Sequence, residues 1–131
     1  MADFSKVIYL ELSYKLTGIF FSVHNERGRF CNEKQYADAV ENYFKKLGLE
    51  YEREKVLPQS FSNEFPGRNR VDFIVDNKIV VEVKAKRVVE REDYYQAKRY
   101  LVALGKKLGI VVNFRDKYLR PKRVLNSSVR E

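Results

Sequence analysis

The chain has 131 residues, of which 44% are hydrophobic, 14% aromatic and 34% charged. This length fits a single domain over residues 1–131, and the apolar content is enough for a core, which excludes disordered, collagen-like and membrane-spanning classes. The one cysteine, Cys31, excludes an internal disulfide and a multi-thiolate metal site, and the one histidine, His24, excludes a two-histidine centre. Any bound metal is therefore expected on oxygen ligands.

The formal net charge of +8 is concentrated in the second half of the chain. Residues 1–66 carry 9 Lys or Arg against 10 Asp or Glu, and residues 67–131 carry 17 against 8, which gives net charges of −1 and +9. A one-sided basic excess is typical of proteins that bind a polyanion, most often through its phosphates, but an ordinary basic surface explains the charge equally well. The apolar runs are too short to cross a bilayer and the N-terminus lacks the pattern of a secretory signal, so we expect a cytoplasmic protein with no membrane partner.

Two helices are predicted at the start of the chain. Apolar residues at helical spacing predict the first over about Lys6 to Glu26, ended by Gly28. Asn32 and Gln35 form a capping-box pattern at the start of the second helix, and Gly48 ends that helix.

The rest of the chain alternates strand and helix patterns. The expected elements are a strand over 49–57, a loop over 58–69, a hairpin of strands 71–75 and 79–85, a helix over 91–105 and a buried strand over 109–114. The basic tail could add a last short strand at 123–125. This order predicts an α/β fold in which helices flank a small mixed sheet of about four strands.

The hairpin carries the residues of chemical interest. Glu82 and Lys84 share one face of its second strand, opposite the apolar face, because alternate residues of a strand point the same way. If residues 76–78 form a three-residue loop, Asp72 lies opposite Glu82 and Arg70 lies opposite Lys84.

Two facing carboxylates, with Cβ atoms about 5 Å apart, repel each other unless a cation lies between them. A hard divalent ion meets that need, and Lys84 beside it could hold and polarise a water molecule. The alternative is an ordinary salt-bridged strand, in which Glu82 pairs with Lys84 or Arg70. The residues alone leave both interpretations open.

Asp72 followed by Glu82-Val83-Lys84 resembles the D-(x)n-E-x-K signature of the PD-(D/E)XK nuclease superfamily, although Val71 stands where the signature has proline. The flanking elements are similar to the helix, strand, strand, strand, helix, strand core of that superfamily. Within it, the segment Gly28–Tyr36, with its Glu33-x-x-Tyr36, is similar to the GxxExxY family, apart from the spacing between glycine and glutamate. The resemblance covers about Leu12 to Val124 and implies a restriction-endonuclease-like α/β fold.

The resemblance also implies roles for individual residues. Mg²⁺ or Mn²⁺ would be bound by Asp72, Glu82, the carbonyl of Val83 and Glu33, and Lys84 would orient the attacking water. Gln96 and Tyr100 resemble the Gln-x-x-x-Tyr motif of RecB-like nucleases, so Gln96 joins the expected catalytic residues. The expected nucleic-acid contacts are Tyr36, Arg68, Arg70, Lys86, Arg99 and Tyr100. On the residues alone, tyrosines at such positions are more often core aromatics, and a single basic residue is more often plain surface.

The implied activity is metal-dependent hydrolysis of phosphodiester bonds in DNA, with RNA as an open alternative substrate. A homodimer is an arrangement that the resemblance allows, because enzymes that cut both strands often pair. A non-catalytic nucleic-acid-binding or accessory module with the same fold is the competing hypothesis.

Overall fold

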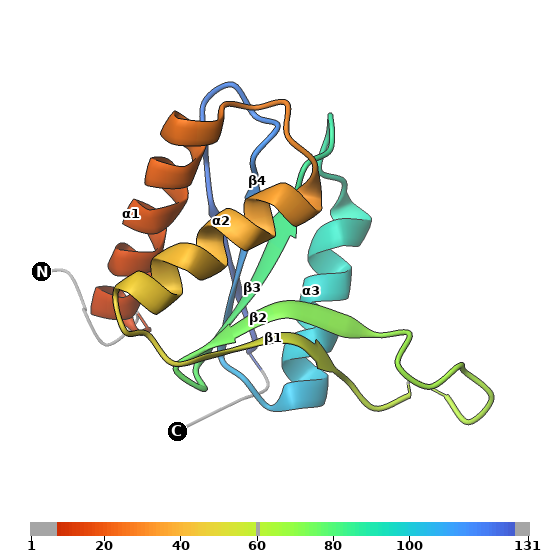
Figure 1. The fold of residues 1–131 in the computed structure, drawn as a ribbon. Coiled ribbons are helices and arrows are strands. Elements are labelled where there is room, and N and C mark those ends of the chain that lie inside the picture. The colour runs from red at the N-terminus through yellow and green to blue at the C-terminus, as the bar shows by residue number, and fades with distance from the viewer. Residues whose placement is uncertain (1–7, 60, 128–131) are drawn as a thin grey trace, which may run out of the picture.

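The computed structural model describes residues 8–59 and 61–127 (Figure 1). The predicted order of elements is confirmed. Over the described residues the helices and strands are α1 (Leu10–Arg27), α2 (Glu33–Lys46), β1 (Tyr51–Val56), β2 (Arg70–Val75), β3 (Ile79–Lys84), α3 (Arg91–Leu104), β4 (Leu108–Asn113) and β5 (Lys122–Leu125). The first helix was expected from Lys6, which lies outside the described residues. None of the helices described is long and apolar enough to span a membrane.

The strands form one mixed sheet in the order β1-β2-β3-β4-β5. Only β3 and β4 are parallel to each other, because α3 connects them as a crossover, and the other neighbouring strands are antiparallel. The described sheet has five strands where about four were expected, since the short segment at Lys122 pairs fully with β4 through contacts such as Gly109 opposite Val124.

Helices cover both faces of this sheet, with α1 and α2 on one side and α3 on the other (Figure 1). Strand β3 lies in the middle and divides its side chains between the two apolar layers. Ile79, Val81 and Val83 pack under α1 and α2, and Val80 packs under α3. A strand buried on both faces is expected to be rich in β-branched residues, as β3 is.

The turn between β2 and β3 contains Asp76, Asn77 and Lys78, with the first two at φ values of 53° and 53°. Asp and Asn adopt this left-handed conformation more readily than most residues. The resulting register places Phe73 opposite Val81, as the three-residue loop predicted. Asp72 and Glu82 are the next residues outward from that pair.

The capping box of α2 is also confirmed. Asn32 Oδ1 accepts a hydrogen bond from the Gln35 amide at 2.9 Å, and Gln35 Oε1 accepts one from the Asn32 amide at 2.9 Å. Glu33 is consequently the first residue of the helix, near the carboxyl end of β3.

Candidate active site

The candidate site lies where β2 and β3 separate. Their regular pairing ends at Phe73 and Val81. Beyond it, side-chain carboxylates take over the hydrogen bonds of the ladder: the Asp72 amide donates to Glu82 Oε2 at 3.1 Å, and the Val83 amide donates to Asp72 Oδ2 at 2.7 Å. The two carboxyl groups are therefore fixed at the opening between the strands, each by the backbone of the opposite strand.

The neighbouring strand β1 is irregular at the same level. Arg53 pairs with Phe73 and Lys55 pairs with Val71, but Glu54, between them, has a φ of 54°. On β2, Val71 packs with the α3 layer although Phe73 packs with the opposite layer, so strict alternation fails across Asp72. Irregularities of this kind re-aim side chains.

A pocket with a volume of about 460 Å³ opens beside these strands. It extends from the start of α2 across the irregular part of β1 to β2 and β3. Its lining residues are Glu33, Lys34, Ala37, Asp38, Arg53, Glu54, Asp72 and Val83.

Glu82 is an unusual buried acid, with only 5% of its surface exposed. Burial raises its pKa to about 9, with further contributions from the negative charge of Asp72 and from a hydrogen bond between the two carboxyl groups. Without a bound cation, Glu82 therefore holds a proton at neutral pH, which removes the repulsion within the pair.

The expected alternative, a salt bridge from Glu82 to Lys84 or Arg70, is not found in the described structure. The Lys84 ammonium lies 4.0 Å from Asp93 Oδ1 on α3, and Arg70 Nε donates to the Gly67 carbonyl at 2.9 Å. Glu82 thus lacks an ion-pair partner among the described residues.

Glu33 lies within electrostatic reach of the same cluster. Partial burial of its carboxyl group raises its pKa, the positive charge of Lys84 lowers it, and the negative charge of Asp72 raises it again. The net effect is an increase in the pKa of Glu33. Its position at the first residue of α2 explains this proximity, because the helix starts where β3 ends.

Lys84 and Lys86 share one carboxylate. Lys86 Nζ contacts the two Asp93 oxygens at 3.1 and 2.9 Å, and Lys84 Nζ lies 4.0 Å from Oδ1. Burial raises the pKa of Asp93, but the hydrogen bonds from Lys86 and from the Glu90 amide outweigh it, so the net pKa is lowered. Lys86, expected to contact nucleic acid, has its charge paired in this structure.

Helix α3 brings Tyr100 towards the carboxyl pair. Tyr100 is 8% exposed, and burial, followed by the negative charge of Glu82, raises its pKa. Gln96 lies one turn earlier and is half-buried, with no hydrogen bond to the other expected catalytic residues in the described part of the chain. Arg99, on the same helix, is exposed.

Tyr36 requires a correction. It was expected to contact nucleic acid, but its side chain is fully buried and its ring stacks on Phe114 with centroids 4.5 Å apart. Its hydroxyl donates to the Gly28 carbonyl at 2.5 Å and accepts from the Cys31 amide at 3.2 Å. The hydroxyl is thus used to fix the turn between α1 and α2, and the ring fills the core.

Arg68 lies near the end of the long loop between β1 and β2, which projects from the sheet (Figure 1), and Arg70 is the first residue of β2. Both are exposed, and the Arg68 guanidinium lies over the ring of Phe65 at 5.5 Å from its centroid. The Arg68 side chain is therefore occupied by an aromatic contact rather than by an acidic partner.

The sequence pattern did not single out Glu54, Arg53 and Asp38 as site residues, yet they line the pocket. Arg53 Nη1 pairs with Asp38 Oδ1 at 2.7 Å and with Glu41 Oε1 at 3.0 Å, which ties β1 to α2. The alternating acidic residues of β1 indicated that Glu54 is exposed. Its positive φ could not be predicted, because glutamate has no preference for that conformation.

The donor atoms around Asp72 and Glu82 are oxygens, as a hard divalent ion requires. Across residues 8–59 and 61–127, no three His, Cys, Asp or Glu side chains are close enough to hold a metal together, so Glu33 does not complete such a group. Mg²⁺ commonly binds through one or two protein carboxylates, with water and substrate phosphate completing its shell. Asp72, Glu82 and the Val83 carbonyl fit that pattern.

Comparisons with known proteins give one family and one fold. The profile of the PD-(D/E)XK nuclease superfamily matches residues 10–124. A search of curated proteins gave no significant match.

Two solved structures share the fold. The crystal structure of SSO0001 is 19% identical, with a TM-score of 0.52, and the similarity covers 71% of this chain and 49% of that one. An alkaline exonuclease (LHK-Exo) from Laribacter hongkongensis is 13% identical, with a TM-score of 0.52, and the similarity covers 72% of this chain and 55% of that one. The chain therefore matches about half the length of each.

Proposed function

Because the chain belongs to the PD-(D/E)XK nuclease superfamily, we propose that it hydrolyses phosphodiester bonds in DNA with a divalent metal ion, Mg²⁺ or Mn²⁺, held at Asp72 and Glu82. The observation that carries this proposal is the pair of carboxyl groups fixed at the opening between β2 and β3. Glu82 is buried and has no ion-pair partner among the described residues, so a cation is the component that would let both groups ionise.

When bound, such an ion would supply Lewis-acid chemistry, by lowering the pKa of a water molecule and neutralising charge on the phosphate. The Val83 carbonyl is the third protein oxygen that we assign to it. Glu33 lines the same pocket but is not grouped with the carboxyl pair, so we assign it an indirect part in holding the ion.

Lys84 is the residue that we assign to the attacking water. Its ammonium is only 4.0 Å from Asp93, a contact long enough to be given up when an anionic substrate arrives. Asp93 keeps Lys86 as its closer partner, at 2.9 Å, so releasing Lys84 does not leave that carboxylate unpaired. Gln96 and Tyr100, on α3, support this side of the site and the phosphate backbone.

The basic second half of the chain favours a nucleic acid substrate, and Arg68, Arg70 and Arg99 are the exposed cations that we assign to its phosphates. One of the similar structures is named as an exonuclease, which agrees with a nucleic acid substrate. We place the chain in the GxxExxY family of the superfamily, on Gly28, Glu33 and Tyr36. A cytoplasmic location and a homodimer stay predictions from the sequence.

The test is cleavage of plasmid, linear, single-stranded and branched DNA by the purified protein with Mg²⁺ or Mn²⁺ and with a chelator. We expect metal-dependent cutting that falls by about a hundredfold or more in Glu82→Gln and Lys84→Ala, because each removes a group that acts on the reacting atoms. Glu52→Gln and Lys78→Ala, both exposed and outside the pocket, serve as matched controls and should cut as the wild type does.

If the folded wild-type protein leaves all four substrates intact with both metals, the proposal is wrong. Cutting that persists in Glu82→Gln and Lys84→Ala would also contradict it, since the activity would then come from elsewhere. DNA binding that weakens with salt, without cleavage, would establish the non-catalytic module instead.

A further inference from the structure

Two arginines share one exposed aromatic ring in the turn that leads into α2. Phe30 lies in the turn between α1 and α2 and is 74% exposed. The Arg29 guanidinium carbon is 5.0 Å from the centre of its ring and that of Arg115, in the turn between β4 and β5, is 5.1 Å from it. We call Arg29, Phe30 and Arg115 the Phe30 cluster.

The two turns that carry the Phe30 cluster are held by hydrogen bonds, in addition to the contacts between the arginines and the ring. Arg29 Nε donates to the Arg115 carbonyl at 2.9 Å, which joins the two turns directly. On one side, the Tyr36 hydroxyl bridges Gly28 and Cys31 around Phe30. On the other, His24 Nε2 is 2.8 Å from the Asp116 carbonyl oxygen, next to Arg115.

The two guanidinium groups carry uncompensated positive charge. In the described structure neither Arg29 nor Arg115 makes a salt bridge, whereas Arg53 pairs with Asp38 and Glu41. Two like charges held at one ring repel each other, so an anion between or beside them would be stabilised. The ring itself offers an apolar surface of the kind on which nucleobases stack.

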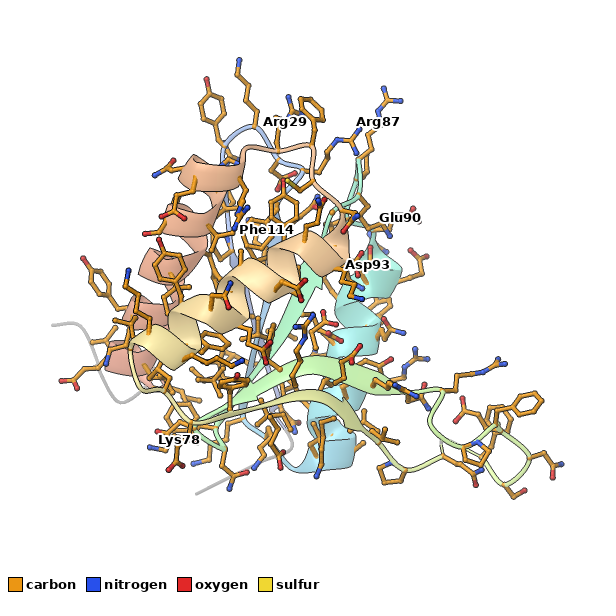
Figure 2. All side chains as sticks on the ribbon, viewed as in Figure 1. Arg29, Lys78, Arg87, Glu90, Asp93 and Phe114 are labelled. Carbon is orange, nitrogen blue, oxygen red and sulfur yellow. The ribbon has the colours of Figure 1, made fainter. Side chains whose placement is uncertain are left out.

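The cluster is linked to the candidate site through both of its turns. Phe30 is three residues before Glu33, which lines the pocket with Asp72. Arg115 follows Phe114, whose amide donates to the Lys84 carbonyl at 2.9 Å. Figure 2 shows Arg29 at the same end of the molecule as the exposed Arg87, which lies just beyond β3.

We propose that the Phe30 cluster binds an unpaired nucleotide of the substrate next to the scissile phosphate, an inference that rests on the proposed nuclease function. The base stacks on Phe30, and its phosphate lies against Arg29 and Arg115. Inside a duplex both faces of a base are covered by its neighbours, so the ring can engage only a base in a single strand, a flap or a frayed end. The proposed site accordingly prefers DNA with a single-stranded segment.

The test is fluorescence anisotropy, in a chelator, with a labelled single strand of roughly 12 nucleotides and a duplex whose two ends are closed by ethylene glycol linkers, so that it has neither frayed ends nor unpaired bases. Phe30→Ala should weaken single-strand binding by about tenfold, because one stacked base is lost, and should change duplex binding by less than about twofold. Phe30→Trp should keep single-strand affinity. Arg115→Gln should lower the salt dependence of single-strand binding by about one phosphate contact, a slope of roughly 0.7.

Tyr14→Ala is the matched control, because Tyr14 is 81% exposed on α1 and lies outside the cluster, and both affinities should be unchanged. Circular dichroism checks that each variant is folded. Equal affinity of the wild type and Phe30→Ala for the single strand overturns the inference, and so does an equal loss on both probes. The readout needs no cleavage, so failure of this inference can be told apart from failure of the nuclease proposal.

Discussion

At the scale of single residues, the most consequential group is the Glu82 carboxyl. Its pKa is raised to about 9 by burial and by Asp72, so the folded protein binds a proton that the unfolded chain releases near its ordinary value of 4.5. By proton linkage, the part of the free energy of unfolding that comes from this proton is fully present below about pH 4.5 and is lost as the pH rises towards 9. A bound divalent cation would reverse that loss by favouring the ionised form.

Glu82→Gln is therefore expected to be more stable than the wild type in a chelator at alkaline pH, by on the order of a few kcal/mol, and inactive. Glutamine keeps the acceptor for the Asp72 amide and donates to the Asp72 carboxylate, but it does not ionise. Thermal denaturation between roughly pH 6 and pH 9 measures the difference, which should widen with pH. Parallel curves for the two proteins would contradict the assignment, and Glu52→Gln should follow the wild type throughout.

The carboxyl pair was predictable because it needs only strand alternation and the length of a three-residue turn, both of which are local. The position of the Tyr36 hydroxyl was not predictable, because a tyrosine in the apolar stripe of a helix can point its hydroxyl outward or bury it. The choice depends on Gly28 and Cys31, whose backbone groups need partners in the turn. The same limit applies to Glu54, whose positive φ belongs to the backbone of β1 and not to its residue type.

At the scale of elements, the turn between α1 and α2 is fixed by that Tyr36 hydroxyl. Tyr36→Phe keeps the ring on Phe114 but leaves the Cys31 amide without its partner, so we expect a loss of about 1–2 kcal/mol in the free energy of unfolding. Urea denaturation measures it. Tyr14→Phe, on an exposed ring, should be neutral, and a similarly neutral Tyr36→Phe would show that the turn is held by other contacts.

The start of α3 is organised by Asp93, which accepts from the Glu90 amide and pairs with Lys86. Its pKa is lowered overall, so the charge stabilises the protein above the ordinary value of 3.8 and loses this effect as the pH falls through the lower, folded value. Asp93→Asn, which keeps an acceptor for the amide, should cost about 1 kcal/mol near pH 7, since Lys86 is partly solvated. Urea denaturation should show this difference shrinking below about pH 4, and a constant difference would contradict it.

Most elements followed from periodicity, caps and glycine positions, because these act within a few residues of one another. The fifth strand is different: its segment has only a weak pattern of its own and joins the sheet by pairing with β4, with Lys122 opposite Val111 and Leu125 opposite Leu108. Such non-local pairing depends on which edge of the sheet is free to pair, and the residues of the segment alone do not determine this.

At the scale of the whole molecule, the Asp72 and Glu82 carboxyl groups and most of the positive charge belong to the same half of the chain. The net charge of +9 over residues 67–131 left a polyanion partner and an ordinary surface equally plausible. In the structure some of these cations are paired, as Lys86 is with Asp93, whereas Arg115 makes no salt bridge among the described residues and is held beside Phe30. The arrangement of the charge, which composition does not give, is what favours a nucleic acid strand.

The most direct test of a metal site at Asp72 and Glu82 is anomalous diffraction from crystals soaked in Mn²⁺ at mildly alkaline pH. We expect an anomalous peak at about 2.0–2.2 Å, the distance for such ions, from oxygens of Asp72, Glu82 and the Val83 carbonyl. The same soak of Glu82→Gln should leave that position without a peak. Wild-type crystals with Mn²⁺ bound elsewhere, or nowhere, and with the Asp72 and Glu82 side chains still bonded only to the facing backbone, would contradict a metal-dependent nuclease site at this position.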